Sequence, residues 1–242
     1  MSRTTLARRT ALVVTCEHGG NDVPAEYAAA FRGAAKVLAS HRGYDPGALE
    51  LARRFAAELH APLFFATVSR LVVELNRSPH HRALFSQFTR PLPEATRRQI
   101  LERHYLPYRT AVEREIARLV GAPGTIVRHL SVHTFTPVLD GETRRADIGL
   151  LYDPRRPLER AWCSAWRDAL LEARPDLIVR RNYPYRGTSD GFVTYLRRRF
   201  PANRYAGIEL EVNQKYPLAG GVAWRRLIAD LTQTLSMTSR TT

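Results

Sequence analysis

The segment ALVVTCEHGGNDVP, residues 11–24, passes from an apolar run into a glutamate, a histidine, two glycines and an asparagine. The run at 11–16 is typical of a strand that is buried on both faces of a sheet. A turn after such a strand needs only a glycine or an asparagine. The extra acidic and imidazole groups, Glu17 and His18, therefore indicate that this strand end has a chemical role, and the glycines would let the backbone pass close to a ligand.

Short apolar runs alternate with longer helical patterns along the rest of the chain. The predicted strands are 11–16, 62–67, 71–76, 125–132, 147–152, 177–181 and 207–213, and the predicted helices are 46–60, 93–120 with a possible break at Pro107, 157–173 and 220–236. This alternation favours an α/β fold with a mostly parallel sheet and helices on both faces. Ligands bind beyond the carboxyl ends of the strands in such sheets. The non-periodic stretch 78–92 is expected to form a loop near that site.

Length and composition favour one soluble domain over residues 1–242, with residues 1–10 and 237–242 frayed. The chain has 242 residues and is 44% hydrophobic, which suffices for a full core. We find no apolar run near the ~20 residues of a membrane span, and the N-terminus lacks the pattern of a signal peptide. Only Cys16 and Cys163 could pair. We therefore expect a cytoplasmic protein with two small, buried cysteines.

The formal net charge of +14 raises the possibility of a nucleic-acid partner. All but two of the 37 basic residues are arginine, and they are scattered in pairs along the chain. The densest run, Arg197 to Arg199, has no aromatic or glycine-rich pattern beside it. We interpret the charge as a solvated basic surface that helps to attract a small anionic substrate, and we expect no nucleic-acid partner.

Two histidines at strand ends are candidate metal ligands. His18 follows the strand 11–16, and His133 follows the strand 125–132. Catalytic zinc takes three protein ligands, of which imidazole is the most common kind, and keeps an open position. Asp45 could supply a third ligand, or it could cap the helix that begins at Pro46. The alternative for each histidine is a hydrogen-bonded structural role.

Glu209 and Glu211 lie two residues apart in an apolar strand, so their side chains share one face. Two buried carboxylates repel each other unless a cation compensates, and a metal or an arginine would do so. A carboxylate beside a metal can act as a general base. The alternative is a solvent-facing strand edge.

The dipeptide Asn76-Arg77 follows another predicted strand. The arginine provides a fork of N–H donors that fits a carboxylate. The alternative is an ordinary surface turn.

Taken together, the motifs resemble the N-formylglutamate amidohydrolase family. The matching segments cover residues 11 to about 215 in family order and include VVTCEHGGNDVP, YDPGALELARRFAAEL, SRLVVELNRSP, YLPYRTAVEREI, LSVHTFTPVLDG, ADIGLLYDP, RNYPYRGTSDG and IELEVNQ. That family is related to the zinc carboxypeptidases and to the aspartoacylase/succinylglutamate desuccinylase group. The resemblance implies a three-layer, phosphorylase/hydrolase-like α/β fold with a mostly parallel or mixed sheet. It also implies one zinc ion per chain.

The resemblance assigns roles to particular residues. The metal ligands would be His18, His133 and a carboxylate, the base would be Glu211 or Glu209, and the substrate would be bound by Asn76, Arg77, Arg70 and Arg186. Relatives usually place the acidic ligand three residues after the first histidine, where this chain has Asn21. Asp45 is the better candidate because its DPGA segment matches a family pattern, with Glu17 and Asp22 as alternatives. The EVN segment, which resembles the Glu-Val-Gly of the desuccinylase group, favours Glu211 over Glu209 as the base.

The function implied by the resemblance is hydrolysis of N-formyl-L-glutamate to formate and L-glutamate, in the amino-acid metabolism of the cytoplasm. Three other functions stay open at this point. The chain could be a zinc amidohydrolase or carboxypeptidase-like enzyme with a different N-acyl or peptide substrate. It could also be an arginine-rich nucleic-acid-binding protein, or a binding module without a metal.

Overall fold

A six-stranded mixed sheet forms the centre of the fold in this computed structural model, which describes residues 9–239. The strand order is β2-β1-β3-β8-β6-β7. Strands β2, β1, β3 and β8 are parallel, whereas β6 is antiparallel to β8 and parallel to β7. The strands are β1 (Arg9–Cys16), β2 (Leu63–Phe65), β3 (Thr125–Phe135), β6 (Ile148–Leu151), β7 (Val179–Arg181) and β8 (Tyr205–Asn213).

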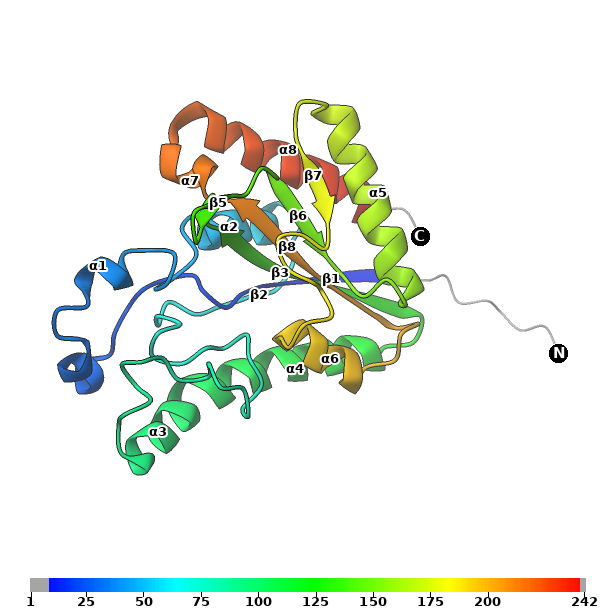
Figure 1. The fold of residues 1–242 in the computed structure, drawn as a ribbon. Helices are drawn as coiled ribbons and strands as arrows, with labels where there is room; N and C mark the ends of the chain where they lie inside the picture. The colour runs from blue at the N-terminus through cyan, green and yellow to red at the C-terminus, as the bar shows by residue number, and fades with distance from the viewer. Residues whose placement is uncertain (1–8, 240–242) are drawn as a thin grey trace.

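Helices cover both faces of the sheet, which gives three layers (Figure 1). Helices α2, α5 and α8 pack on one face and share its main hydrophobic core, with α7 beside them, whereas α4 and α6 pack on the other face. The α-helices are α1 (Ala35–Leu38), α2 (Ala48–Glu58), α3 (Glu94–Ile100), α4 (Leu106–Gly121), α5 (Pro157–Ala173), α6 (Phe192–Arg199), α7 (Lys215–Ala219) and α8 (Gly221–Ser239). The predicted fold class, an α/β protein with helices on both faces of a mixed sheet, is confirmed.

Three shorter elements complete the chain. A 3₁₀ turn, η1, spans Ala25–Phe31, and a π-helical turn, η2, spans Leu101–Tyr105 between α3 and α4. Strands β4 (Val138–Leu139) and β5 (Glu142–Thr143) form a small separate hairpin. Within the described residues, no helix is both long and apolar enough to cross a membrane.

The prediction of a strand at 71–76 is wrong, because this segment forms turns. The N–H of Val72 bonds to the carbonyl of Ser69, and that of Glu74 bonds to the carbonyl of Leu84. Its apolar residues are nevertheless buried, in a second core with η1 and η2. A short apolar run looks the same in a buried turn segment as in a strand, so the run alone could not distinguish them.

The predicted element ends differ in several places. The predicted helix 93–120 is α3, η2 and α4 in succession, and Pro107 lies in the first turn of α4 instead of breaking the helix. Helix α8 continues to Ser239, so residues 237–239 are not frayed, and residue 9 already belongs to β1. The other residues that were expected to fray at the two ends, 1–8 and 240–242, lie outside the described residues. The arginines at 197–199 lie in α6, a helix that was not predicted.

Helix α2 begins at Ala48, so Asp45 is not its N-cap. The N-cap is Gly47, whose φ of 80° lies in the left-handed region that favours glycine. A side chain there would also meet Pro217, since a Cβ would lie 2.4 Å from the Pro217 Cβ. The carboxylate of Asp45 is therefore free of capping and points elsewhere.

Candidate metal centre and active site

The candidate site lies where β1, β3 and β8 end. His18 comes two residues after the end of β1, and His133 lies near the end of β3. In the parallel register of β3 and β8, Ser131 pairs with Glu209 and His133 pairs with Glu211. Parallel neighbours end at the same sheet edge, so strands far apart in sequence bring these side chains together.

The glycines of the Glu-His-Gly-Gly turn are required by a close backbone approach. The N–H of Gly19 bonds to the Ala66 carbonyl at 2.9 Å. At Gly20, an added Cβ would lie 2.5 Å from the Thr67 carbonyl oxygen, which only a glycine avoids. The turn therefore runs tightly along residues 66–67, and this course fixes where His18 stands.

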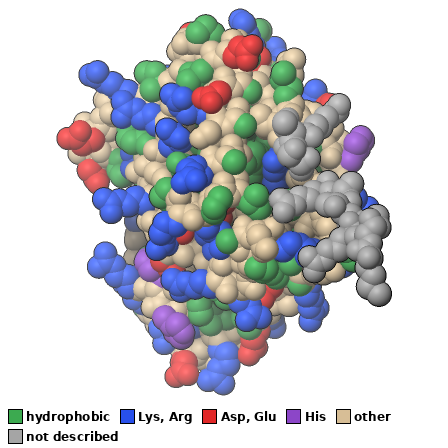
Figure 2. Space-filling view, turned by 90° about the vertical axis from the view of Figure 1, so that its right-hand side faces the viewer, with side chains coloured by type: hydrophobic (Ala, Val, Ile, Leu, Met, Phe, Trp, Pro, Cys, Tyr) green, Lys and Arg blue, Asp and Glu red, His purple; other side chains and the backbone are tan. Residues whose placement is uncertain are grey.

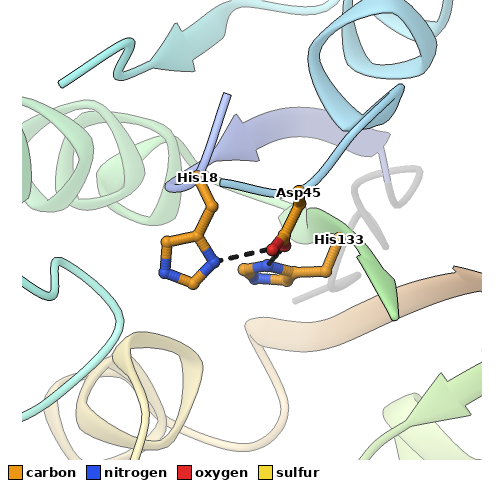
Figure 3. Close-up of side chains that lie close together, drawn as sticks. All are labelled: His18, Asp45 and His133. Atoms are coloured by element: carbon orange, nitrogen blue, oxygen red, sulfur yellow. Dashed lines mark hydrogen bonds and ion pairs between the residues drawn. The ribbon is translucent and has the colours of Figure 1, made fainter. Parts of the chain in front are cut away.

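Two imidazoles and one carboxylate meet in a buried group of candidate metal ligands (Figure 3). Asp45 Oδ2 lies 3.2 Å from His18 Nδ1 and 2.9 Å from His133 Nδ1. One ligand atom from each of the three residues lies within 4.8 Å of the other two. Two imidazole nitrogens and a carboxylate oxygen form a donor set of the kind that catalytic zinc uses.

The main chain holds the Asp45 carboxylate in this position. The N–H of Asp45 bonds to the carbonyl of His18 at 2.9 Å, and the N–H of Ala48 bonds to the carbonyl of Asp45. The segment between the turn and α2 is therefore tied to the His18 turn. The Asp45 carboxylate therefore faces the two histidines instead of the start of α2.

The outer nitrogen of each histidine also faces a carboxylate. His18 Nε2 contacts Glu74, and His133 Nε2 lies 3.3 Å from Glu17 Oε2. A carboxylate behind the imidazole is the usual way in which proteins orient a metal-ligating histidine. Both Nδ1 atoms face Asp45, and both Nε2 atoms face an outer carboxylate. This arrangement fits a metal ion bound at the two Nδ1 atoms and Asp45.

The two outer carboxylates are held in their charged form. Burial alone would raise the pKa of Glu17, but hydrogen bonds from His133 and from Ser131 lower it well below its usual value. Burial likewise opposes ionisation of Glu74, and the charges of Arg70 and His18 outweigh it and lower its pKa. The sequence prediction considered Glu17 only as a ligand and missed Glu74.

Asp22, the other alternative for the acidic ligand, is exposed and does not line the site. Its main chain instead forms an isolated bridge with Val68. The side chain one residue before it, Asn21, bonds to the carbonyl of Leu38. Of the three acidic alternatives, Asp45 alone belongs to the group whose ligand atoms converge.

A cavity of about 180 Å³ opens in front of this group. A larger hollow of about 490 Å³ between α2 and α8 is lined by none of the candidate residues. The small cavity is lined by all the predicted site residues, namely His18, Asp45, Arg70, Asn76, Arg77, His133, Arg186, Glu209 and Glu211. It is also lined by Thr134, Tyr185, Ser189 and Asp190, which the sequence did not single out.

Glu211 is buried in this cavity with one oxygen unused. Its Oε2 has no hydrogen-bond partner in the described part of the chain. Burial is the main cause that raises the pKa of Glu211 to about 8, and the negative charges of Asp45 and Glu209 add to it against the opposing charge of His133. Glu209 is also buried, and burial raises its pKa. Of the two glutamates, only Glu211 keeps a buried carboxyl oxygen without a hydrogen-bond partner among the described residues.

The three candidate arginines differ in how far they are already paired. Arg70 donates to Glu74 Oε2 at 2.8 Å and to Asp45 Oδ1 at 3.2 Å. Arg77 donates to the backbone carbonyl of Asp190. Arg186 is exposed, and no side chain of residues 9–238 forms an ion pair with it. Arg77 and Arg186 are therefore the more available of the three for a ligand carboxylate.

Asn76 lies between His133 and the start of helix α6. Its Oδ1 accepts a hydrogen bond of 2.7 Å from the N–H of Phe192 at the start of α6, and its Nδ2 lies 3.4 Å from His133 Nε2. An added Cβ at Gly191 would lie 3.3 Å from Asn76 Oδ1, so the glycine allows this approach. Asn76 is thus positioned from both sides.

A three-layer α/β fold that carries a buried His-Asp-His group and a buried glutamate at one sheet edge fits an amidohydrolase. The chain belongs to the N-formylglutamate amidohydrolase family, whose model matches residues 10–217. The resemblance found in the sequence motifs is thereby confirmed.

Solved structures are similar to this chain to different degrees. The gene product Atu2144 from Agrobacterium tumefaciens has 28% identity and a TM-score of 0.77, over 94% of this chain and 89% of that chain. The N-acetylmuramoyl-L-alanine amidase AmiC2 of Nostoc punctiforme has 14% identity and a TM-score of 0.40, over 94% of each chain. A metallo-carboxypeptidase from Burkholderia cenocepacia has 13% identity and a TM-score of 0.42, over 98% of this chain and 58% of that one. The last two likenesses are too weak to bear on function, and no curated protein sequence matches the chain.

Proposed function

We propose that the protein hydrolyses the amide bond of a small N-acyl amino acid with the help of one zinc ion, and that the substrate is N-formyl-L-glutamate. The observation that supports this most strongly is the position of Glu211. Glu211 lines the same cavity as His18, Asp45 and His133, and its buried Oε2 has no hydrogen-bond partner among the described residues. Those three residues would hold the zinc ion, which when bound would supply Lewis-acid chemistry at the acyl carbonyl.

In this proposal Glu211 moves the proton. It takes a proton from the attacking water while the water oxygen bonds to the formyl carbon, and it then gives that proton to the leaving nitrogen as the C–N bond breaks. The products are formate and L-glutamate. A carboxyl group in this role must be buried and must keep an oxygen for the proton; Glu211 is buried, and its Oε2 is unpaired among the described residues.

The cavity offers groups for the two carboxylates of N-formylglutamate. Arg77 and Asn76 would bind the first carboxylate, because a guanidinium fork fits a carboxylate and holds the substrate at a fixed place. Arg186 is the better candidate for the second, since Arg70 already pairs with Glu74 and Asp45. We propose that Arg70 mainly fixes those two carboxylates. The small cavity volume also favours a small substrate.

On the face that Figure 2 shows, the distribution of basic side chains supports a small substrate over a nucleic-acid partner. Figure 2 shows one face of the molecule, on which lysine and arginine side chains are dispersed among acidic and apolar ones. A nucleic-acid surface usually gathers its basic residues in one patch or stripe. We therefore propose that the positive charge helps to attract a small anion.

A screen of N-formyl, N-acetyl and N-succinyl amino acids, run with a metal assay on the same samples, tests the proposal. We expect release of formate from N-formyl-L-glutamate, with weaker turnover of monocarboxylate analogues such as N-formyl-L-alanine. Preferred turnover of an N-acetyl or N-succinyl substrate would instead show that the enzyme is an amidohydrolase specific for a different acyl group. No turnover of any of them by zinc-loaded protein would refute the proposed function.

A further inference from the structure

Arg109 of α4 is buried, and no carboxylate of the described residues pairs with it. Its residue is only 6% exposed, and it forms no ion pair with an acidic side chain of residues 9–238. Its guanidinium carbon lies 4.1 Å from the ring centre of Phe192, 4.9 Å from that of Tyr195 and 5.0 Å from that of Tyr105. Three aromatic rings thus surround the cation, and their π-faces stabilise the buried guanidinium.

The guanidinium of Arg109 also holds the backbone of the segment that carries Arg77. Its Nη1 donates to the carbonyl of Leu75 at 2.9 Å and lies 3.4 Å from the carbonyl of Arg77. Tyr105, one turn earlier at the end of the π-helical turn, donates its hydroxyl to the same Arg77 carbonyl at 2.7 Å. This segment forms turns and not a strand, so no sheet ladder fixes it, and the two side chains supply hydrogen bonds that a ladder would have given.

A second segment of the cavity wall meets the same cluster. Phe192, which lies against Arg109, begins α6, and its N–H bonds to Asn76. The loop just before it supplies the Asp190 carbonyl to the Arg77 guanidinium and the Asp190 carboxylate to the N–H of Ser78 at 3.0 Å. Arg109 therefore stands between the two segments that meet at Arg77.

We propose that Tyr105 and Arg109 are positioning residues, which hold the backbone at Leu75 and Arg77 so that the Arg77 guanidinium faces the substrate carboxylate. The inference rests on the proposed role of Arg77 in substrate binding. Neither Tyr105 nor Arg109 lines the cavity, so both act through Arg77 and not on the substrate. The inference also assigns a role to the π-helical turn η2, because this turn places the Tyr105 hydroxyl at the Arg77 carbonyl.

The test compares Tyr105→Phe with Tyr195→Phe. Both variants keep a ring against Arg109, but only Tyr105→Phe loses a hydrogen bond to the Arg77 carbonyl, whereas the Tyr195 hydroxyl bonds to Glu113 on α4. Loss of one such bond should raise KM for N-formyl-L-glutamate about 3- to 10-fold in Tyr105→Phe, with little change in kcat. Tyr195→Phe should behave as wild type. An unchanged KM in Tyr105→Phe, or an equal rise in both variants, would overturn the proposal.

A double-mutant cycle with Arg77→Ala shows whether Tyr105 acts through Arg77. The backbone carbonyl of residue 77 remains in this variant, so only the guanidinium is lost. If Tyr105 positions that guanidinium, adding Tyr105→Phe to Arg77→Ala should leave KM unchanged. A further rise in KM of the same size as in the wild-type background would show an independent effect and would contradict the proposal.

Hydrogen exchange of the backbone separates this inference from the proposed function. The amides of residues 75–78 should exchange faster in Tyr105→Phe than in wild type, and Tyr195→Phe should show no such change. Arg109→Lys, which keeps the charge but loses the planar fork, should also speed this exchange. If wild-type protein turns over no N-formyl amino acid, the proposed function fails, and exchange still decides whether these side chains hold the segment. Unchanged exchange in both variants would refute that.

Discussion

His133 of β3 and Glu211 of β8 stand directly opposite each other in the parallel register of the sheet. The imidazole of His133 contacts carboxylates at both nitrogens, whereas Glu211 keeps an oxygen without a partner among the described residues. A histidine with a carboxylate at each ring nitrogen is thus the register partner of a buried glutamate with one unpaired oxygen. We assign the first to binding the metal and the second to moving a proton.

Replacement of either histidine should greatly reduce metal binding. We expect the wild-type protein to bind about one zinc ion per chain, and His18→Ala and His133→Ala each to bind much less. Both residues lie at the sheet edge and add little to the main core, so circular dichroism should show a folded protein. His104→Ala, a change in a histidine outside the cavity, is the control and should keep its zinc. Full zinc occupancy in the variant that lacks both His18 and His133 would refute the ligand assignment.

The two strand glutamates should differ in their effects. Glu211→Gln keeps the side-chain shape but removes the proton acceptor, so kcat should fall about 10²- to 10⁴-fold while zinc stays bound. Glu209→Gln should have a milder effect on turnover. Measurement of kcat and zinc content in both variants decides between them. An almost inactive, zinc-loaded Glu209→Gln beside an active Glu211→Gln would reverse the assignment of the base.

Arg77 should not tolerate a change to lysine, which lacks the planar fork. Loss of a charge-assisted contact of about 2–3 kcal/mol should lower kcat/KM for N-formyl-L-glutamate roughly 30- to 150-fold in Arg77→Ala, and much of this loss should persist in Arg77→Lys. Arg98→Lys, a change in an exposed arginine that pairs with Glu94 on α3, serves as the matched control. Wild-type kcat/KM in Arg77→Ala would show that the carboxylate is bound elsewhere.

His129 should make the free energy of unfolding fall in acid. It is buried between Thr15 and Tyr205, and burial lowers the pKa of its imidazole from 6.5 to about 4. Between these values the unfolded chain binds the extra proton, so stability is complete above pH 6.5 and declines as the pH falls toward 4. From pH 7 to pH 5 this group should remove about 2 kcal/mol.

Denaturant unfolding of wild type and His129→Gln at several pH values measures this contribution. The glutamine can still hydrogen-bond but does not titrate, so the stability of His129→Gln should decline less between pH 7 and pH 5. The difference between the two proteins isolates His129 from the other titrating groups. Two curves that decline in parallel would contradict the assignment.

The sequence predicted the central strands well, because β1, β3 and β8 are rich in apolar residues and are largely buried. The segment at 71–76 failed because its burial comes from packing against η1 and η2, contacts that its own sequence does not reveal. The π-helical turn was also missed, because the sequence was assigned one helix across residues 93–120.

Part of the candidate site was predictable because several of its residues lie at the ends of predicted strands. His18, His133 and Glu211 occupy strand ends, so their positions follow from the fold class alone. Glu74 lies in a turn, and its contact with His18 depends on how residues 70–77 fold back. Its only sequence signal is its place between Arg70 and Asn76, both of which were candidates. Arg109 looked like an ordinary helix residue, because two of the three rings around it come from α6, which is distant in the sequence.

Formate release from N-formyl-L-glutamate, measured on one preparation before chelation, after chelation and after zinc is added back, tests the central claim most directly. We predict that zinc-loaded protein releases formate, that the chelated protein with little residual zinc does not, and that added zinc restores the rate. Undiminished release by metal-depleted protein, or no release by protein that holds one zinc ion per chain, would contradict the account.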